Sequence, residues 1–261
     1  MRTHRYDNGD WSRRSLLVVL ALGCLAAASL LTGLGLAVHG SLTHAHARHV
    51  SSASTANSAD ARDEIARRPY PSVDPSAAQP GALSTFRFAV LRLPPPTVAG
   101  PARVATGFPR TEEGALAQLA AIDQSALQSA SVPEAQRIIT AWAAPRGPTA
   151  ASWSGVRGIA ALLGSAGLPA TGSPTLVVAA SPEMGLIRGA VGSEYVVACV
   201  DFVVTATLTQ TTRTAAADCQ RLEWVHRRWV IGPGTEPAQA PSVWPGTDAA
   251  HEVGWRELRD D

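Results

Sequence analysis

The first long hydrophobic segment of the chain runs from Leu16 to Val38 and contains neither a charged residue nor a proline. As a helix it would be about 34 Å long, which is enough to cross a hydrocarbon core of about 30 Å. Several arginines precede this segment and only Arg48 follows it closely. The positive-inside rule therefore predicts a cytoplasmic tail at 1–15, a single transmembrane helix at 16–38 and an extracytoplasmic remainder.

Two other interpretations of this segment stay open. The sequence Ala45-His46-Ala47 has the small-x-small form of a signal-peptide cleavage site, but the apolar run is longer than the roughly 7 to 15 residues usual for a signal peptide. Cys24 would be the modified residue of a lipoprotein, but the apolar run continues well past it. The length of the run favours an uncleaved anchor in the lipid bilayer.

Residues 39–82 are rich in Ser, Ala, His and Pro and poor in large apolar side chains. Such a segment cannot bury enough surface to offset its ordering entropy, so we expect a flexible spacer over 39–105, with a short edge strand or a docking segment at 85–93. Four histidines, at His39, His44, His46 and His49, could bind a metal or sense pH. A structural metal site needs a fixed frame, so we interpret this cluster as solvated linker.

Helical spacing of apolar residues begins near residue 112. Thr111 before two glutamates predicts a helix start, because a hydroxyl caps free N–H groups and carboxylates favour the positive end of the helix dipole. Ser131 to Glu134 has the form of a capping box and predicts a second helix that ends before Pro145. A third helix is expected from about Ala150. One face of the first helix would carry Leu116, Leu119, Ala120, Asp123 and Leu127.

From Pro174 the apolar period changes to two, which predicts strands at 176–180, 184–191, 194–209, 216–226 and 228–231. In the longest strand, every second residue from Val196 to Leu208 is apolar, and only the three preceding helices are available to cover that face. The expected fold class is α+β, with helices packed on a curved antiparallel sheet in an extracytoplasmic domain at 106–261.

Cys199 and Cys219 lie on strands that should pair, in a compartment that permits disulfides. A bridge would stabilise the fold by about 3 kcal/mol in the loop-entropy picture. Whether the two residues face each other depends on a register that the sequence leaves open, so the bridge stays an alternative to two free thiols.

Composition excludes several activities. The 22 basic residues are all arginine, so the chain lacks the lysine of a P-loop and the amine of Schiff-base catalysis. The net charge is +1 and no dense basic stripe occurs, so direct binding of nucleic acid is not expected. We find no hydrolase, zinc, dithiol or dinucleotide motif. The prediction is a non-enzymatic protein with no catalytic, cofactor-binding or metal-binding residues.

Four individual residues are candidates for a functional role. Asp201 is an acid on the longest strand, but it belongs to the face opposite the helices, so a structural or interface carboxylate is favoured over a general base. His226 lies in a polar turn, where solvation explains it. Trp244 and Trp255 in the C-terminal tail are candidate interface residues, with packing back onto the sheet as the alternative.

The arrangement of tail, span, spacer, helices and curved sheet resembles the bitopic assembly subunits of type IV secretion and conjugation systems (TcpC-like), which have a nuclear-transport-factor-2-like cone. Five short runs are also similar to membrane proteins of actinobacterial conjugative elements: GFPRTEEGA (107–115), CVDF (199–202), ADCQ (217–220), WVIGPG (229–234) and PSVWPGT (241–247). The resemblance implies a single-pass scaffold of a DNA-transfer apparatus, in contact with other channel subunits and with further copies of itself as a homo-oligomer.

Two alternatives remain. An accessory subunit of an envelope lipid-import complex would share the plan of anchor and cone. A membrane-tethered cone-fold enzyme of the cyclase or isomerase kind is a different class. That enzyme would place Asp201 or His226 in a deep pocket, whereas a filled apolar interior would argue against it.

Overall fold

The computed structural model describes the backbone from Val50 to Asp261 and the side chains from Ser58 onward. The predicted span at 16–38, the cytoplasmic tail and the histidine cluster lie outside these described residues. From Val50 onward, no helix combines the length and the apolar composition that crossing a membrane requires.

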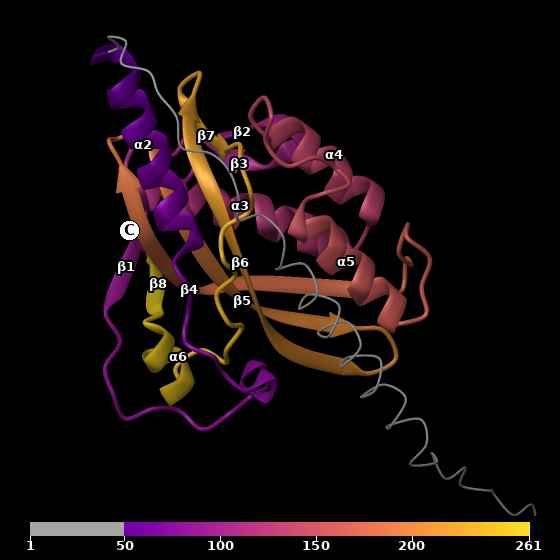
Figure 1. Ribbon diagram of the computed structural model, residues 1–261. Coiled ribbons are helices and arrows are strands. Elements are labelled where there is room, and N and C mark those ends of the chain that lie inside the picture. Colours follow the sequence, from indigo (N-terminus) through magenta and orange to yellow (C-terminus); the bar gives the residue numbers. More distant parts are fainter. Residues whose placement is uncertain (1–49) are drawn as a thin grey trace, which may run out of the picture. The chain divides into compact units, whose positions relative to one another are not determined.

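The centre of the domain is a six-stranded sheet with the order β1-β8-β4-β5-β6-β7. All neighbouring strands are antiparallel except β1 and β8, which run parallel. The sheet curls into a half-barrel around the helices (Figure 1). Its strands are β1 (Val90–Leu93), β4 (Val177–Val191), β5 (Tyr195–Thr207), β6 (Thr211–Val225), β7 (Arg228–Ile231) and β8 (Arg256–Asp260).

Three consecutive helices cover one face of this sheet, and the fold is therefore α+β, as the sequence predicts. They are α3 (Glu112–Ser129), α4 (Val132–Trp142) and α5 (Ser154–Ser165). The apolar face of β5 packs against α3, with Val196, Val200 and Phe202 in one cluster with Leu116 and Leu119. The alternation read from the sequence thus identifies the helix-covered face of β5 correctly.

The helix starts show where local signals succeed and fail. Thr111 caps α3, since its hydroxyl accepts a hydrogen bond from the Gly114 N–H at 3.0 Å. Ser131 precedes α4 without a side-chain cap bond, and Glu134 pairs with Arg137 instead of closing a capping box. α5 begins later than predicted, because residues 149–152 form a separate hydrogen-bonded turn.

The strands also differ from the prediction, most clearly at β4. The two strands expected at 176–180 and 184–191 are one continuous strand, β4, which stays paired with β5 through Pro182. Register shifts at Pro182/Met184 and at Ile187/Gly189 absorb the irregularity. Such bulges accommodate a proline within a strand, which the sequence pattern alone reads as a break.

The second face of the sheet is closed by the C-terminal segment. Met184, Cys199 and Cys219 pack there against Val243 and Trp255. This segment contains α6 (Asp248–Val253) and β8, and neither was expected from the sequence. A small two-stranded sheet, β2 (Val98–Ala99) with β3 (Ala105–Thr106), and the 3₁₀ turns η1 (Pro75–Ala78) and η2 (Pro101–Arg103) complete the fold.

The expected spacer is partly helix. α2 (Val50–Arg67) lies along the sheet, and its Ile65 and Ala66 are buried against Tyr195. An ion pair of 2.7 Å joins Asp63 on α2 to Arg221 on β6. Composition missed this docking because it uses two apolar side chains and ion pairs rather than a long apolar stripe. The strand expected at 85–93 is shorter, and only Val90–Leu93 form β1.

Candidate functional site

Cys199 and Cys219 are joined by a disulfide in the structure, with an S–S distance of 2.08 Å. The pairing of β5 with β6 places them directly opposite each other, with Cα atoms 4.0 Å apart. The hydroxyl of Tyr70, which follows α2, lies 2.9 Å from the Cys199 Sγ. The disulfide therefore lies next to Tyr70, on the sheet face away from the helices.

Asp201 lies on the face opposite the helices, as the alternation indicates, but it is fully buried there. Its Oδ2 accepts a weak hydrogen bond of 3.4 Å from the Val243 N–H, and its Oδ1 has no partner. Burial raises the pKa of Asp201 well above its ordinary value. The residue lines no pocket between helices and sheet, and with no exposure it presents no interface carboxylate.

The other residues singled out from the sequence do not line the cavity between the helices and the sheet. His226 is exposed in the turn between β6 and β7 and has a positive φ of 49°. Trp255 is only 2% exposed and donates to the Pro241 carbonyl, so it packs back onto the sheet instead of anchoring a partner. Trp244 is half-buried beside the Arg213 guanidinium, and of the two tryptophans it alone keeps contact with solvent.

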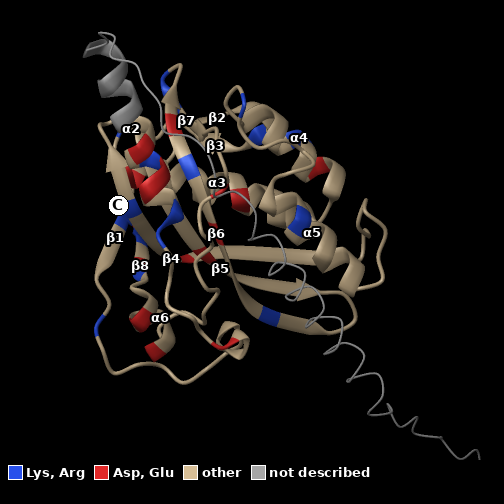
Figure 2. Cartoon of the chain, viewed as in Figure 1, with Lys and Arg blue, Asp and Glu red and all other residues tan. Residues whose placement is uncertain are grey.

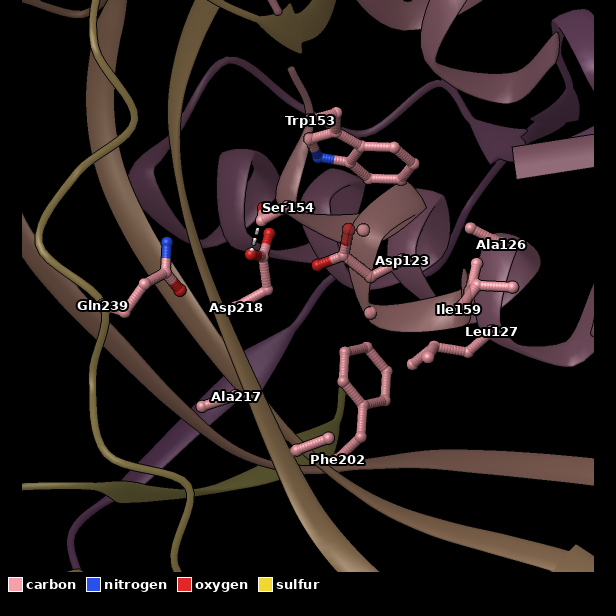
Figure 3. A pocket seen from close by; sticks show the side chains of 13 residues that line it. Asp123, Ala126, Leu127, Trp153, Ser154, Ile159, Phe202, Ala217, Asp218 and Gln239 are labelled. Atoms are coloured by element: carbon pink, nitrogen blue, oxygen red, sulfur yellow. Dashed lines mark hydrogen bonds between the residues drawn. The ribbon is translucent and has the colours of Figure 1, made fainter. Parts of the chain in front are cut away.

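A cavity of about 190 Å³ lies between the helices and the sheet. Its walls come from α3, α5, β5 and β6, and Gln239 from the C-terminal segment stands at its edge (Figure 3). Most of the lining is apolar, with Leu127, Ile159 and Phe202 as the largest aliphatic and phenyl groups. Two carboxyl groups, Asp123 and Asp218, enter this apolar space.

Asp123 is placed in the cavity by the buried face of α3. It is 4% exposed, and neither carboxyl oxygen has a hydrogen-bond partner. Burial, followed by the nearby charges of Asp218 and Glu236, raises its pKa well above the ordinary value. Burial without a hydrogen-bond donor therefore penalises the charged form of this carboxyl.

Asp218 is held by β6 on the other side of the cavity, and the two carboxyl groups point toward one another (Figure 3). It accepts hydrogen bonds of 2.8 Å from the Ser154 hydroxyl and from the Gln220 amide. Burial raises the pKa of Asp218 to about 6, against the opposing effect of these donors. The site thus pairs two carboxyl groups whose pKa values burial raises, an arrangement that can hold or accept a proton or bind a cation.

Trp153 adds a third polar group to the cavity wall. Trp153 is fully buried, and its indole N–H has no hydrogen-bond acceptor. Unpartnered buried polar atoms are uncommon, and three of the six found in the described residues, two on Asp123 and one on Trp153, belong to the lining of this one cavity. No group of three or more potential metal ligands occurs in residues 50–261.

This site was not predicted from the sequence, although both acids are visible there. Asp123 stands on the apolar face of the first predicted helix, where an acid is unusual, and this was the available signal. Asp218 lies in one of the runs that carry the family resemblance, but nothing local assigns it a chemical role.

Comparisons with known proteins identify no relative of this chain: no protein-family description, no curated protein and no solved structure matches it significantly. The cavity and the surfaces described above therefore have to be interpreted from their own chemistry.

Proposed function

We propose that the chain is a single-pass membrane protein whose extracytoplasmic domain, a nuclear-transport-factor-2-like cone, is a non-enzymatic assembly subunit of a conjugative DNA-transfer apparatus. The anchor is the apolar segment 16–38, and the domain binds other channel subunits. The type of apparatus comes from the sequence resemblance alone. The observation that carries partner binding is an exposed apolar segment on the domain, residues 79–89, which we call the strap.

The strap exposes large apolar side chains although it is fixed in place. Leu83 is 74% exposed and Phe86 60% exposed. The Ser84 N–H donates to the Gly246 carbonyl at 2.7 Å, and the Phe86 ring stacks on His251 with centroids 4.7 Å apart. Exposed apolar side chains on an ordered segment are typical of protein-binding surfaces, because a partner gains their burial without ordering the segment first.

A docked α2 supports the same proposal. Arg221 is a cation with a side chain only 6% exposed, and α2 supplies its counter-ion, Asp63. A second pair joins Arg62 to Glu223 at 2.9 Å. Acidic and basic residues are interspersed along the described part of α2 (Figure 2). Undocking α2 would leave a buried arginine without its carboxylate, which is costly. The C-terminal half of α2 is thus fixed to the domain, as suits a subunit that must hold its partners in a constant orientation.

The test is a mating assay in the native host with the strap altered. Leu83→Ser with Phe86→Ser should lower transfer frequency by about tenfold or more, because two apolar anchors of an interface are lost. Val177→Ser is the matched control, since Val177 is 63% exposed on β4 outside the strap. Normal transfer by the strap variant at wild-type protein levels would contradict the proposal.

The acid pair favours one other function, a membrane-tethered cone-fold enzyme. A carboxyl with a pKa of about 6, such as Asp218, could act as a general base in an apolar cavity. Asp218→Asn distinguishes the two functions. If the chain is an assembly subunit, this variant should support normal transfer. If the chain is an enzyme, the variant should no longer support transfer. Cross-links to channel partners should persist in both cases.

A further inference from the structure

The cavity between α3, α5 and the sheet is lined by two acidic side chains and, within the described chain, by no basic side chain. The nearby Glu236 is already engaged, since its carboxylate accepts from the Ser154 N–H at 2.7 Å and from Arg157 at 3.0 Å. Asp218 has only neutral donors, and Asp123 has none. The space between the two carboxyl groups is therefore electronegative and open to a cation.

The rest of the cavity wall determines the size and polarity of the group that can be attached to the cation. Leu127, Ile159 and Phe202 form an apolar surface beside the acids (Figure 3). An apolar protein cavity of about 150 Å³ is known to accommodate benzene, so the 190 Å³ here leaves room for one six-membered ring and a short polar group. Gly158 and Gln239 line the cavity and are exposed, which places its opening between α5 and the C-terminal segment.

We propose that this cavity binds a small organic cation, with a primary ammonium group between the carboxylates of Asp123 and Asp218 and an apolar body against Leu127, Ile159 and Phe202. An ammonium group has three donors, which suits carboxylate oxygens that lack partners. The Phe202 and Trp153 rings add an attraction for cations that neutral ligands do not gain. The inference goes beyond the assembly function and does not depend on it.

Charge recognition can be separated from simple filling of an apolar hole. Benzylamine, benzyl alcohol and toluene have similar size and differ in charge and donors. With the purified full chain at neutral pH, calorimetry should show benzylamine binding at least about tenfold more tightly than benzyl alcohol, as expected for charge-assisted hydrogen bonds. Equal affinities for the amine and the alcohol would refute cation recognition, and the absence of binding by all three would refute the ligand site.

Two variants assign the binding to the acids. Asp123→Asn keeps the shape of the side chain and removes the charge, so benzylamine should bind about tenfold more weakly while toluene is unaffected. Glu134→Gln is the control, because Glu134 is an acid on α4 that does not line the cavity. If Asp123→Asn did not fold, Asp218→Asn would serve as the second variant with the same expectation. Unchanged benzylamine affinity in a folded acid variant would overturn the proposal.

Discussion

Replacing Asp218 with asparagine should weaken the dependence of stability on pH. The carboxyl binds its proton more tightly in the folded chain than in the unfolded chain, because burial raises its pKa from 3.8 to about 6. Between these values the folded state carries more protons, so the free energy of unfolding falls as pH rises through this window and levels off above it. A difference of about 2 pKa units corresponds to about 3 kcal/mol, an upper bound for a residue that keeps some exposure.

The assay is urea unfolding of the full chain in detergent micelles between pH 4 and pH 8, followed by tryptophan fluorescence. In the wild type, Asp218 should contribute a drop of up to about 3 kcal/mol, and Asp123 and Asp201 add to it in the same direction because burial also raises their pKa values. Asp218→Asn should lose the part of the drop that Asp218 contributes, so its slope should be shallower than that of the wild type. Asp74→Asn is a control of opposite sign, because a hydrogen bond from Ser76 lowers the pKa of this exposed acid. An unchanged slope in Asp218→Asn would refute the interpretation.

Three further changes test the fold. The double variant Cys199→Ala with Cys219→Ala lacks the disulfide that joins residues 20 positions apart, so its free energy of unfolding in urea should be about 3 kcal/mol lower. Equal stability of the variant and the oxidised wild type would contradict this. Gly114→Ala should lower the melting temperature, because a Cβ there would lie 2.0 Å from the Pro109 carbonyl oxygen. Gly158→Ala meets no atom within 4 Å and should instead stabilise α5 by about 0.5–1 kcal/mol, measured in the same melts.

Local signals predict those parts of the fold that depend on local chemistry. Thr111 caps its helix, and the alternation in β5 identifies the face that α3 covers. The structure of the C-terminal segment could not be predicted in this way, because it depends on contacts that are distant in sequence. Trp255 packs against Met184 of β4, and β8 pairs with β4 and β1. The same holds for α2, which docks through single contacts such as the ion pair of Asp63.

The candidate site was hidden for a related reason. An acid within a helical apolar stripe, Asp123, is visible in the sequence, but its meaning depends on what lies opposite it. Asp218 and Trp153 arrive there from β6 and from the start of α5, and only the folded chain brings the three together. The alternation in β5 did place Asp201 correctly, yet it could not reveal that the C-terminal segment buries it.

The most direct test of the assembly function is cross-linking in membranes of the native host, followed by identification of the proteins recovered with this chain. We expect recovery of a coupling ATPase of the DNA-transfer channel. Recovery should fall in the variant with Leu83→Ser and Phe86→Ser and persist in Val177→Ser. Recovery of a lipid-binding porter in place of the ATPase, or of no channel subunit at all, would contradict it.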